Sequence, residues 1–153
     1  MSTTVYTYND KVLVNSANDK WLKKPDAPAG FVMNASNATI SNNTANWEGP
    51  NYPEYCDLGG KTAQFIISED ISASSLVLYY SKELSSSASP EMCRLFGDSN
   101  NTITTGTYSI TVNNNQAPAA QGAYGKYLTM FRYGPDTTID STLLSKIEIR
   151  ILD

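Results

Sequence analysis

The sequence predicts an all-β protein built from short antiparallel strands arranged as a sandwich or barrel. Segments rich in Val, Ile, Tyr, Phe and Thr recur about every ten residues, separated by clusters of Asn, Gly, Pro and Ser. The apolar residues show no convincing amphipathic-helix period, and strands do not alternate with helical patterns as in parallel sheets. A chain of 153 residues is long enough for its own core, so we expect a single domain over residues 1–153.

The expected strands follow from this pattern in chain order. In the first part of the chain they are Thr4–Tyr8, Lys11–Val14, Gly30–Met33, Ala38–Ile40, Glu54–Leu58 and Thr62–Ile67. In the second part they are Ser75–Ser81, Met92–Gly97, Thr107–Val112, Lys126–Tyr133 and Leu144–Leu152. Asn9 and Asp10 tolerate positive φ angles and join the first two strands into a hairpin. Residues 1–29 are therefore expected to form a hairpin and an extended loop that contacts a partner.

Two kinds of strand pattern indicate which faces are buried. In the last strand Ile147, Ile149 and Ile151 alternate with charged residues, which predicts one packed face and one face in water. Residues 76–80 and 65–67 are instead continuously apolar, which is typical of strands covered on both faces. We expect these two segments to form the middle of the core.

Three long stretches are expected to be loops, namely Asn15–Ala29, Ser41–Pro53 and Asn113–Ala123. A shorter one, Ser81–Pro90, has room for a single helical turn before its serine run opposes helix. Loops longer than about twelve residues in a compact β domain are usually functional or mobile. Binding residues are therefore expected first in these loops.

The composition excludes several classes of function. The chain has no His, which removes Ser-His and Cys-His nucleophilic pairs and histidine-ligated zinc. Its formal charge of -4 and its lack of a Lys/Arg run disfavour nucleic acid as a partner. No apolar stretch approaches the roughly 18–20 residues that span a bilayer. The first residues encode no secretory signal, so we expect a trimmed chain or a product of the cytosol.

Cys56 and Cys93 leave two interpretations open. Neither belongs to a C-x-x-C pair, which argues against a zinc knuckle or a thioredoxin-type redox site. Two buried thiols are the simpler interpretation. A disulfide between them is the alternative, because both flank expected strands that could be neighbours.

One short segment concentrates the side chains that recognise sugars. Its candidate binding residues are Trp47, Glu48, Asn51, Tyr52 and Tyr55. Aromatic faces pack on the C–H surface of a pyranose, carboxylates and amides bond its hydroxyls, and prolines stiffen the loop. The alternative is that Trp47 closes one end of the sandwich and the tyrosines pack on a sheet.

A second aromatic group lies near the C-terminus. Tyr124 and Tyr133 are candidate ligand contacts, and Tyr127, Thr129, Phe131 and Tyr133 share one face of the expected strand. This face is either an exposed aromatic stripe or one side of a sheet that is covered on both sides.

The acidic residues give no catalytic or metal signature. Glu48 with Glu54 or Asp57, and Asp136 with Asp140, could form a glycosidase acid pair, but their separation cannot be read from sequence. Calcium could be held by the same oxygens, yet no D-x-[DN]-x-[DN]-G loop occurs. We therefore expect a protein without cofactor that is not an enzyme.

The C-terminal segment Gly125–Tyr133, a polar turn and Leu144–Leu152 resembles the closing strand pair of jelly-roll domains. Such pairs are common in carbohydrate-binding modules and in bacteriophage virion appendages. The resemblance implies a jelly-roll-like antiparallel β-sandwich with long loops, in a binding or structural role. The absence of a signal favours a homo-oligomeric virion-surface protein made in the host cytosol, in contact with itself, other virion proteins or a surface glycan. An extracellular carbohydrate-binding module cut from a longer bacterial protein is the alternative.

Overall fold

The computed structural model describes residues 31–48, 60–81, 84, 91–112, 127–135 and 137–152, and the backbone of three N-terminal strands. The first strands are β1 (Val5–Tyr8), β2 (Lys11–Asn15), β3 (Lys20–Trp21), β4 (Val32–Met33), β5 (Thr39–Ser41) and β6 (Thr44–Glu48). They are followed by β7 (Thr62–Ile67), β8 (Ile71–Ser72), β9 (Ser75–Ser81), β10 (Glu91–Phe96), β11 (Thr102–Ile103) and β12 (Gly106–Thr111). The last elements are β13 (Tyr127–Tyr133), helix α1 (Ser141–Leu144) and β14 (Ile147–Ile151).

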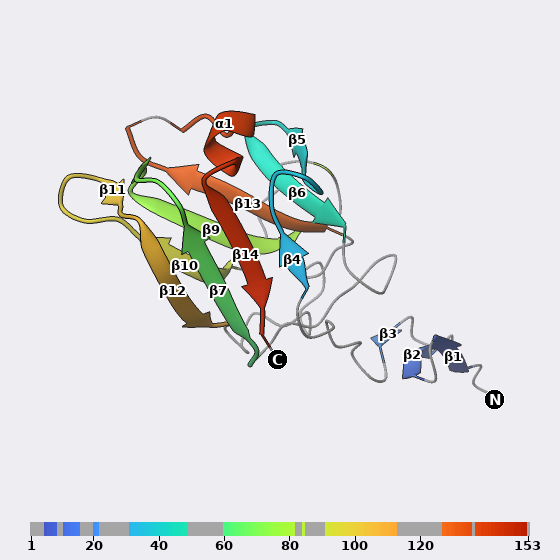
Figure 1. Cartoon of the computed structure of the whole chain (residues 1–153). Helices are drawn as coiled ribbons and strands as arrows, with labels where there is room; N and C mark the ends of the chain where they lie inside the picture. Colours follow the sequence, from blue (N-terminus) through green and yellow to red (C-terminus); the bar gives the residue numbers. More distant parts are fainter. Residues whose placement is uncertain are drawn as a thin grey trace.

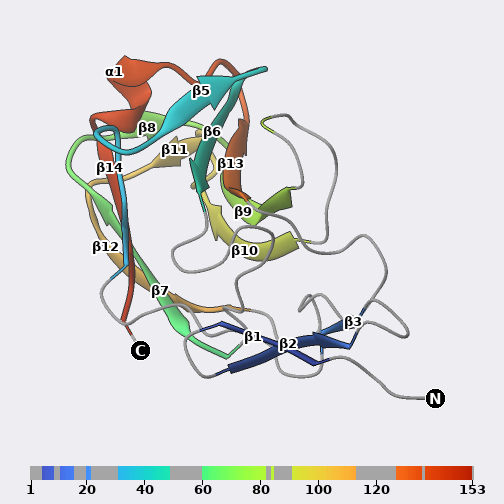
Figure 2. The same cartoon turned by 90° about the vertical axis from the view of Figure 1, so that its right-hand side faces the viewer.

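Two antiparallel sheets pack face to face, so the expected β-sandwich is confirmed (Figure 1). One sheet has five strands in the order β10-β9-β13-β6-β5, and the other has four in the order β12-β7-β14-β4. Seen after a turn of 90°, the four-stranded sheet and the five-stranded sheet stand side by side as two layers (Figure 2). Strands β8 and β11 form a separate two-stranded ladder.

The strand pairing is that of a jelly roll. The eight principal strands, in chain order, are β4, β6, β7, β9, β10, β12, β13 and β14. The first pairs with the last, β4 with β14, and the second with the seventh, β6 with β13. The third pairs with the sixth, β7 with β12, and the two middle strands, β9 and β10, pair with each other. This nested order winds the chain back and forth between the two sheets.

The core lies between the two layers and follows the strand alternation. Ile147, Ile149 and Ile151 are at most 5% exposed, as their spacing predicts. Every residue of β9 is buried, which confirms the expectation for residues 76–80, and β9 lies between β10 and β13. Strand β7 differs, because Phe65 and Ile67 are buried while Ile66 is half-buried on the outer face.

A tight hairpin occupies part of the expected loop Ser41–Pro53, and this prediction was wrong for residues 44–48. Asn42 and Asn43 have φ values of 49° and 56°, and Ser41 pairs with Thr44. Two successive left-handed residues form the type I′ turn that fits the twist of a hairpin. Two asparagines therefore join β5 to β6, and β6 continues to Glu48.

A short helix precedes β14, where the sequence was interpreted as having no helix. Asp140 has extended backbone angles, and its Oδ1 accepts a hydrogen bond from the backbone N of Leu143 at 2.8 Å. This is an N-cap, which satisfies one of the free N–H groups of a first helical turn. Leu143 and Leu144 are buried, so Leu144 belongs to α1 rather than to the strand that was expected to begin there.

The N-terminal segment contains an antiparallel strand pair. Strands β1 and β2 pair antiparallel with Tyr8 opposite Lys11, and β3 pairs with β2 inside the segment that was expected to be a loop. The expected strand Glu54–Leu58 and the expected loop Asn113–Ala123 lie outside the described residues, as does most of Ser81–Pro90.

Candidate functional site

The outer face of the five-stranded sheet carries an uneven set of side chains. The registers of β10, β9 and β13 define two outward rows across the sheet, first Arg94, Val77 and Phe131, and next to it Phe96, Ser75 and Tyr133. Further along, Thr129 is fully buried on the same face, and its hydroxyl donates to Asn46 Oδ1 at 2.7 Å. This face is therefore covered toward Thr129 and open at Tyr133. The end at Tyr133 is an exposed aromatic surface, whereas the end at Thr129 belongs to a sheet that is covered on both sides.

An open groove of about 470 Å³ lies on this face. Its lining residues are Asn42, Asn43, Thr44, Val77, Glu91, Arg94, Phe131, Arg132, Tyr133 and Thr137. The type I′ turn between β5 and β6 lines one side, and β10 supplies the charged pair on the other side. We call this feature the Arg94 groove.

An arginine between two aromatic rings is the most distinctive group at the Arg94 groove. The guanidinium carbon of Arg94 lies 5.6 Å from the ring centre of Phe96 and 6.0 Å from that of Tyr133. The two rings stand on β10 and β13, which are separated by β9. By the usual strand spacing, β10 and β13 lie about 9.5 Å apart. Ser75, opposite both in the register, is small enough to leave this space to the arginine. Cation–π attraction holds the guanidinium in place.

A chain of edge-to-face contacts fixes the ring of Tyr133. Its ring centre is 4.8 Å from that of Phe131 at 87°, and Phe131 is 5.3 Å from Tyr79 at 69°. Tyr79 is buried, and this burial raises its pKa. The nearby Tyr133 makes a smaller contribution in the same direction. Tyr133 and Phe96 are 49% and 66% exposed, so both rings offer surface to a partner.

Among the sequence-predicted site residues that the structure describes, Tyr133 lies apart from Trp47 and Glu48, which pair with the other end of β13. Tyr133 lies in the Arg94 groove. Trp47 faces the core instead, 2% exposed, and its Nε1 donates to the carbonyl of Asn34 at 3.0 Å. Its predicted ring contact with a ligand is therefore corrected in favour of the alternative, a tryptophan that closes the sandwich. Glu48 is exposed at the far end of β6 from the groove.

The other candidate contacts lie outside the described residues, namely Asn51, Tyr52, Tyr55 and Tyr124. Sequence reasoning missed Arg94 and Phe96, which stand on β10, a strand that was predicted to within one residue at each end. The available signal was the alternation of Arg94 and Phe96 with the apolar Leu95, which puts both on the outer face.

No family model, curated protein or solved structure matches this chain.

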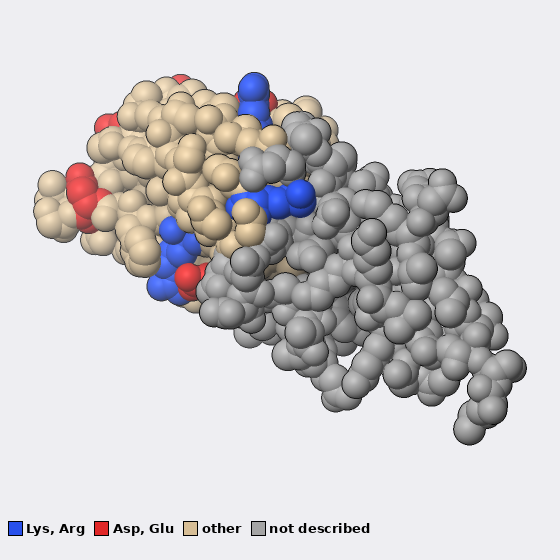
Figure 3. Space-filling model, turned by 90° about the horizontal axis from the view of Figure 1, so that it is seen from below, with Lys and Arg blue, Asp and Glu red and all other residues tan. Residues whose placement is uncertain are grey.

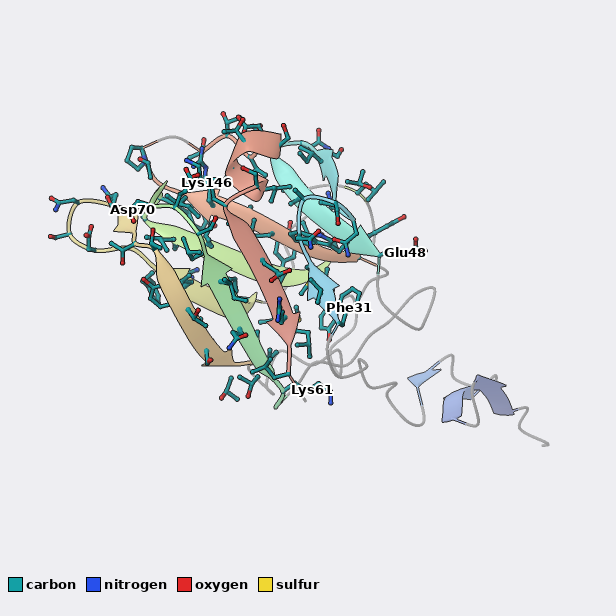
Figure 4. The ribbon with its side chains drawn as sticks, in the orientation of Figure 1. Phe31, Glu48, Lys61, Asp70 and Lys146 are labelled. Atoms are coloured by element: carbon teal, nitrogen blue, oxygen red, sulfur yellow. The ribbon has the colours of Figure 1, made fainter. Side chains whose placement is uncertain are left out.

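The described aspartates accept hydrogen bonds in connecting segments and at a helix cap. Asp70 accepts hydrogen bonds from the backbone N and the hydroxyl of Thr105, which lower its pKa. Asp98 Oδ1 accepts from the backbone N of Thr102 at 3.1 Å, and Asp140 caps α1. Figure 4 shows Asp70 and Glu48 on opposite sides of the sandwich.

The proposed acid pairs with Glu54, Asp57 and Asp136 involve partners outside the described residues. In the part of the chain that the structure describes, no three metal-binding side chains gather at one point. In the same part, no helix is long and apolar enough to cross a membrane. On the face shown in Figure 3, charged side chains are scattered over a mostly uncharged described surface.

Cys93 is a free thiol, 3% exposed, in the core cluster. Burial is the main reason that the pKa of this thiol is raised from 9.0 to about 12, and the charge of Glu91 adds to the shift. The thiol stays protonated at neutral pH and is a poor nucleophile. Cys93 is unpaired in the structure, which favours the interpretation with buried thiols over the disulfide, and Cys56 lies outside the described residues.

The raised pKa of Cys93 predicts a pH-dependent loss of stability. The unfolded thiol ionises near 9.0 and the folded one near 12, so the free energy of unfolding is unaffected by this group below 9.0 and falls above it. We expect Cys93→Val to gain stability relative to the parent as the pH rises above 9.0. Urea unfolding of both proteins on either side of this pH measures the difference. A constant difference would contradict the raised pKa.

Proposed function

We propose that this protein is a non-catalytic adhesion module on the surface or an appendage of a bacteriophage virion, and that the Arg94 groove is its contact surface. The observation that carries the binding role is the pair of exposed rings, Phe96 and Tyr133, on either side of Arg94. Exposed aromatics and arginine are the residues that contribute most to binding at protein surfaces. The virion setting is supported by the jelly-roll strand order, through the resemblance to appendage proteins.

The rigidity of the Arg94 groove also supports binding. Its floor consists of Val77 and Phe131 on paired central strands, and one side is a two-residue turn with fixed backbone angles. A site on strands loses little conformational entropy when a ligand binds. Its volume lies within the roughly 300–1,000 Å³ range of small-ligand sites.

A second candidate is a carbohydrate-binding module of a secreted bacterial protein. The same groove favours it, because Tyr133 offers a ring face while Asn42, Asn43 and Thr137 offer amide and hydroxyl groups. The two candidates share the contact surface. They differ in whether the protein is part of a virion or of a secreted bacterial protein.

The contact surface predicts the result of one substitution. Tyr133→Ala removes an exposed ring from the groove, and we expect it to weaken adhesion of the labelled protein to bacterial cells about tenfold, or about 1.4 kcal/mol. Leu152→Ala is the matched control, since Leu152 is 44% exposed and follows β14 of the other sheet. Equal loss in both variants, or no loss in either, would show that the groove is not the contact surface.

The virion setting has its own test. Mass spectrometry of purified phage particles is expected to find this chain at a fixed ratio to the capsid protein. Consistent absence from particles, with glycan binding retained, would favour the secreted binding module.

A further inference from the structure

We propose that the Arg94 groove binds an acidic sugar, with the sugar carboxylate on the guanidinium of Arg94 and the sugar ring against Tyr133. This inference rests on the proposed binding role of the groove and names the ligand class. Uronic acids and sialic acids have the required chemistry, which is a carboxylate on a hydroxyl-rich ring with an apolar C–H face.

One exposed guanidinium in the groove offers a contact for an anion. Arg94 lies on the outer face of the sheet with Val77 and Phe131, and its side chain is 34% exposed. Arg132 also lines the groove, but it lies opposite the core residue Leu76 in the register, and its Nη1 donates to the carbonyl of Ser72 at 3.1 Å. Arg94 therefore carries the guanidinium that a ligand carboxylate can reach from the groove.

Arg94 presents only one end to a ligand. Its Nε atom is buried and makes no hydrogen bond among the described residues. Its Nη2 atom contacts Glu91 Oε2 in an ion pair, and the two side chains are 34% and 41% exposed. Exposed ion pairs of this kind contribute roughly 0–1 kcal/mol. A ligand carboxylate can therefore replace Glu91 at the Nη end at little cost and form the bidentate contact that arginine favours.

The rest of the groove matches the remaining parts of a sugar. Phe131 and Val77 form an apolar floor, and Tyr133 adds a ring that Phe131 holds edge-on. Asn42 and Asn43 are exposed on the opposite side, held by the type I′ turn, with amide groups that can donate to and accept from hydroxyls. An acidic peptide could also use Arg94, so the test below includes one.

A second ion pair on the molecule provides a matched control. Arg150 donates to Glu148 Oε2 through Nε at 3.0 Å and through Nη2 at 2.8 Å, on the outer face of the four-stranded sheet. The described residues give Arg150 no aromatic ring contact. The same substitutions can therefore be made in the Arg150–Glu148 pair as in the Arg94–Glu91 pair, but away from the proposed site.

The test compares acidic sugars with their neutral counterparts. Binding of galacturonate oligosaccharides and sialyllactose is measured by titration calorimetry or NMR, alongside the carboxyl-reduced oligosaccharides, lactose and a poly-glutamate peptide. We expect at least one acidic sugar to bind about tenfold more tightly than its neutral form, and this preference to weaken as salt is added. Equal binding of acidic and neutral forms would overturn the inference and leave the proposed glycan contact intact. Binding of the peptide alone would also overturn it.

The variants separate the ligand class from the contact surface. Arg94→Lys keeps the charge but loses the planar fork, and we expect about tenfold weaker binding of the acidic sugar with the neutral sugar unchanged. Glu91→Gln removes the competing carboxylate, so acidic-sugar binding should become several-fold tighter. Arg150→Lys and Glu148→Gln should change neither. If Glu91→Gln weakens binding instead, Glu91 contacts hydroxyls and the carboxylate assignment is wrong. If no sugar or peptide binds and Tyr133→Ala leaves cell adhesion unchanged, the groove fails as a contact surface altogether.

Discussion

Trp47→Ala is expected to lower the free energy of unfolding by about 3–5 kcal/mol, which is the usual cost of truncating a buried large aromatic side chain. Trp47 is 2% exposed, packs in the core cluster between the sheets, and satisfies the carbonyl of Asn34 through its indole N–H. Truncation therefore leaves a large cavity and also an unpaired carbonyl. Urea unfolding followed by circular dichroism measures the change without relying on tryptophan fluorescence.

Two further variants show whether packing is the reason. Trp47→Phe keeps an apolar ring and loses the hydrogen bond to Asn34, so it should cost less than Trp47→Ala. Tyr133→Ala, at a side chain 49% exposed, should cost about 1 kcal/mol or less. If Trp47→Ala kept full stability and lost only glycan binding, Trp47 would be a ligand contact and its core position would be wrong.

Local patterns were enough to predict much of the sandwich. Strands β7 and β9 begin and end at the residues that the apolar runs indicate, and the isoleucines of β14 face the core as their alternation predicts. These features depend on side-chain alternation within one strand, which sequence displays directly. The hairpin at Asn42–Asn43 was also visible in principle, because two asparagines between β-type runs suit a type I′ turn.

The site could not be predicted because its members meet only through tertiary pairing. Arg94 and Phe131 face the same groove because β10 and β13 both pair with β9, and no local pattern reports which strands become neighbours. Trp47 shows the opposite error. An aromatic residue among prolines and asparagines suggested an exposed loop, whereas the register of β6 with β13 turns its side chain inward.

Gly134→Ala is expected to cost about 2–5 kcal/mol, because it combines a strained backbone with a steric clash. Gly134 follows β13 with a φ of +140°, which residues with a side chain rarely adopt. A Cβ atom there would lie 2.5 Å from the backbone N of Ser74 and 2.8 Å from the Cα of Ala73. Neither backbone atom can move freely, since Ser74 N donates to the carbonyl of Tyr133 at 2.6 Å.

Two other glycines separate the two causes. Gly97→Ala tests the clash, because its Cβ would lie 2.5 Å from the carbonyl of Ala73, so it too should be clearly destabilising. Gly106→Ala tests the backbone, since its φ is +157° but its Cβ would approach only the flexible ring of Tyr108 at 3.5 Å, so it should cost least. If all three variants unfold at the same urea concentration as the parent, the segment Ala73–Ser74 does not pass between the ends of β10 and β13. In that case the position of Tyr133, the neighbour of Gly134 and a side of the Arg94 groove, would lose its structural support.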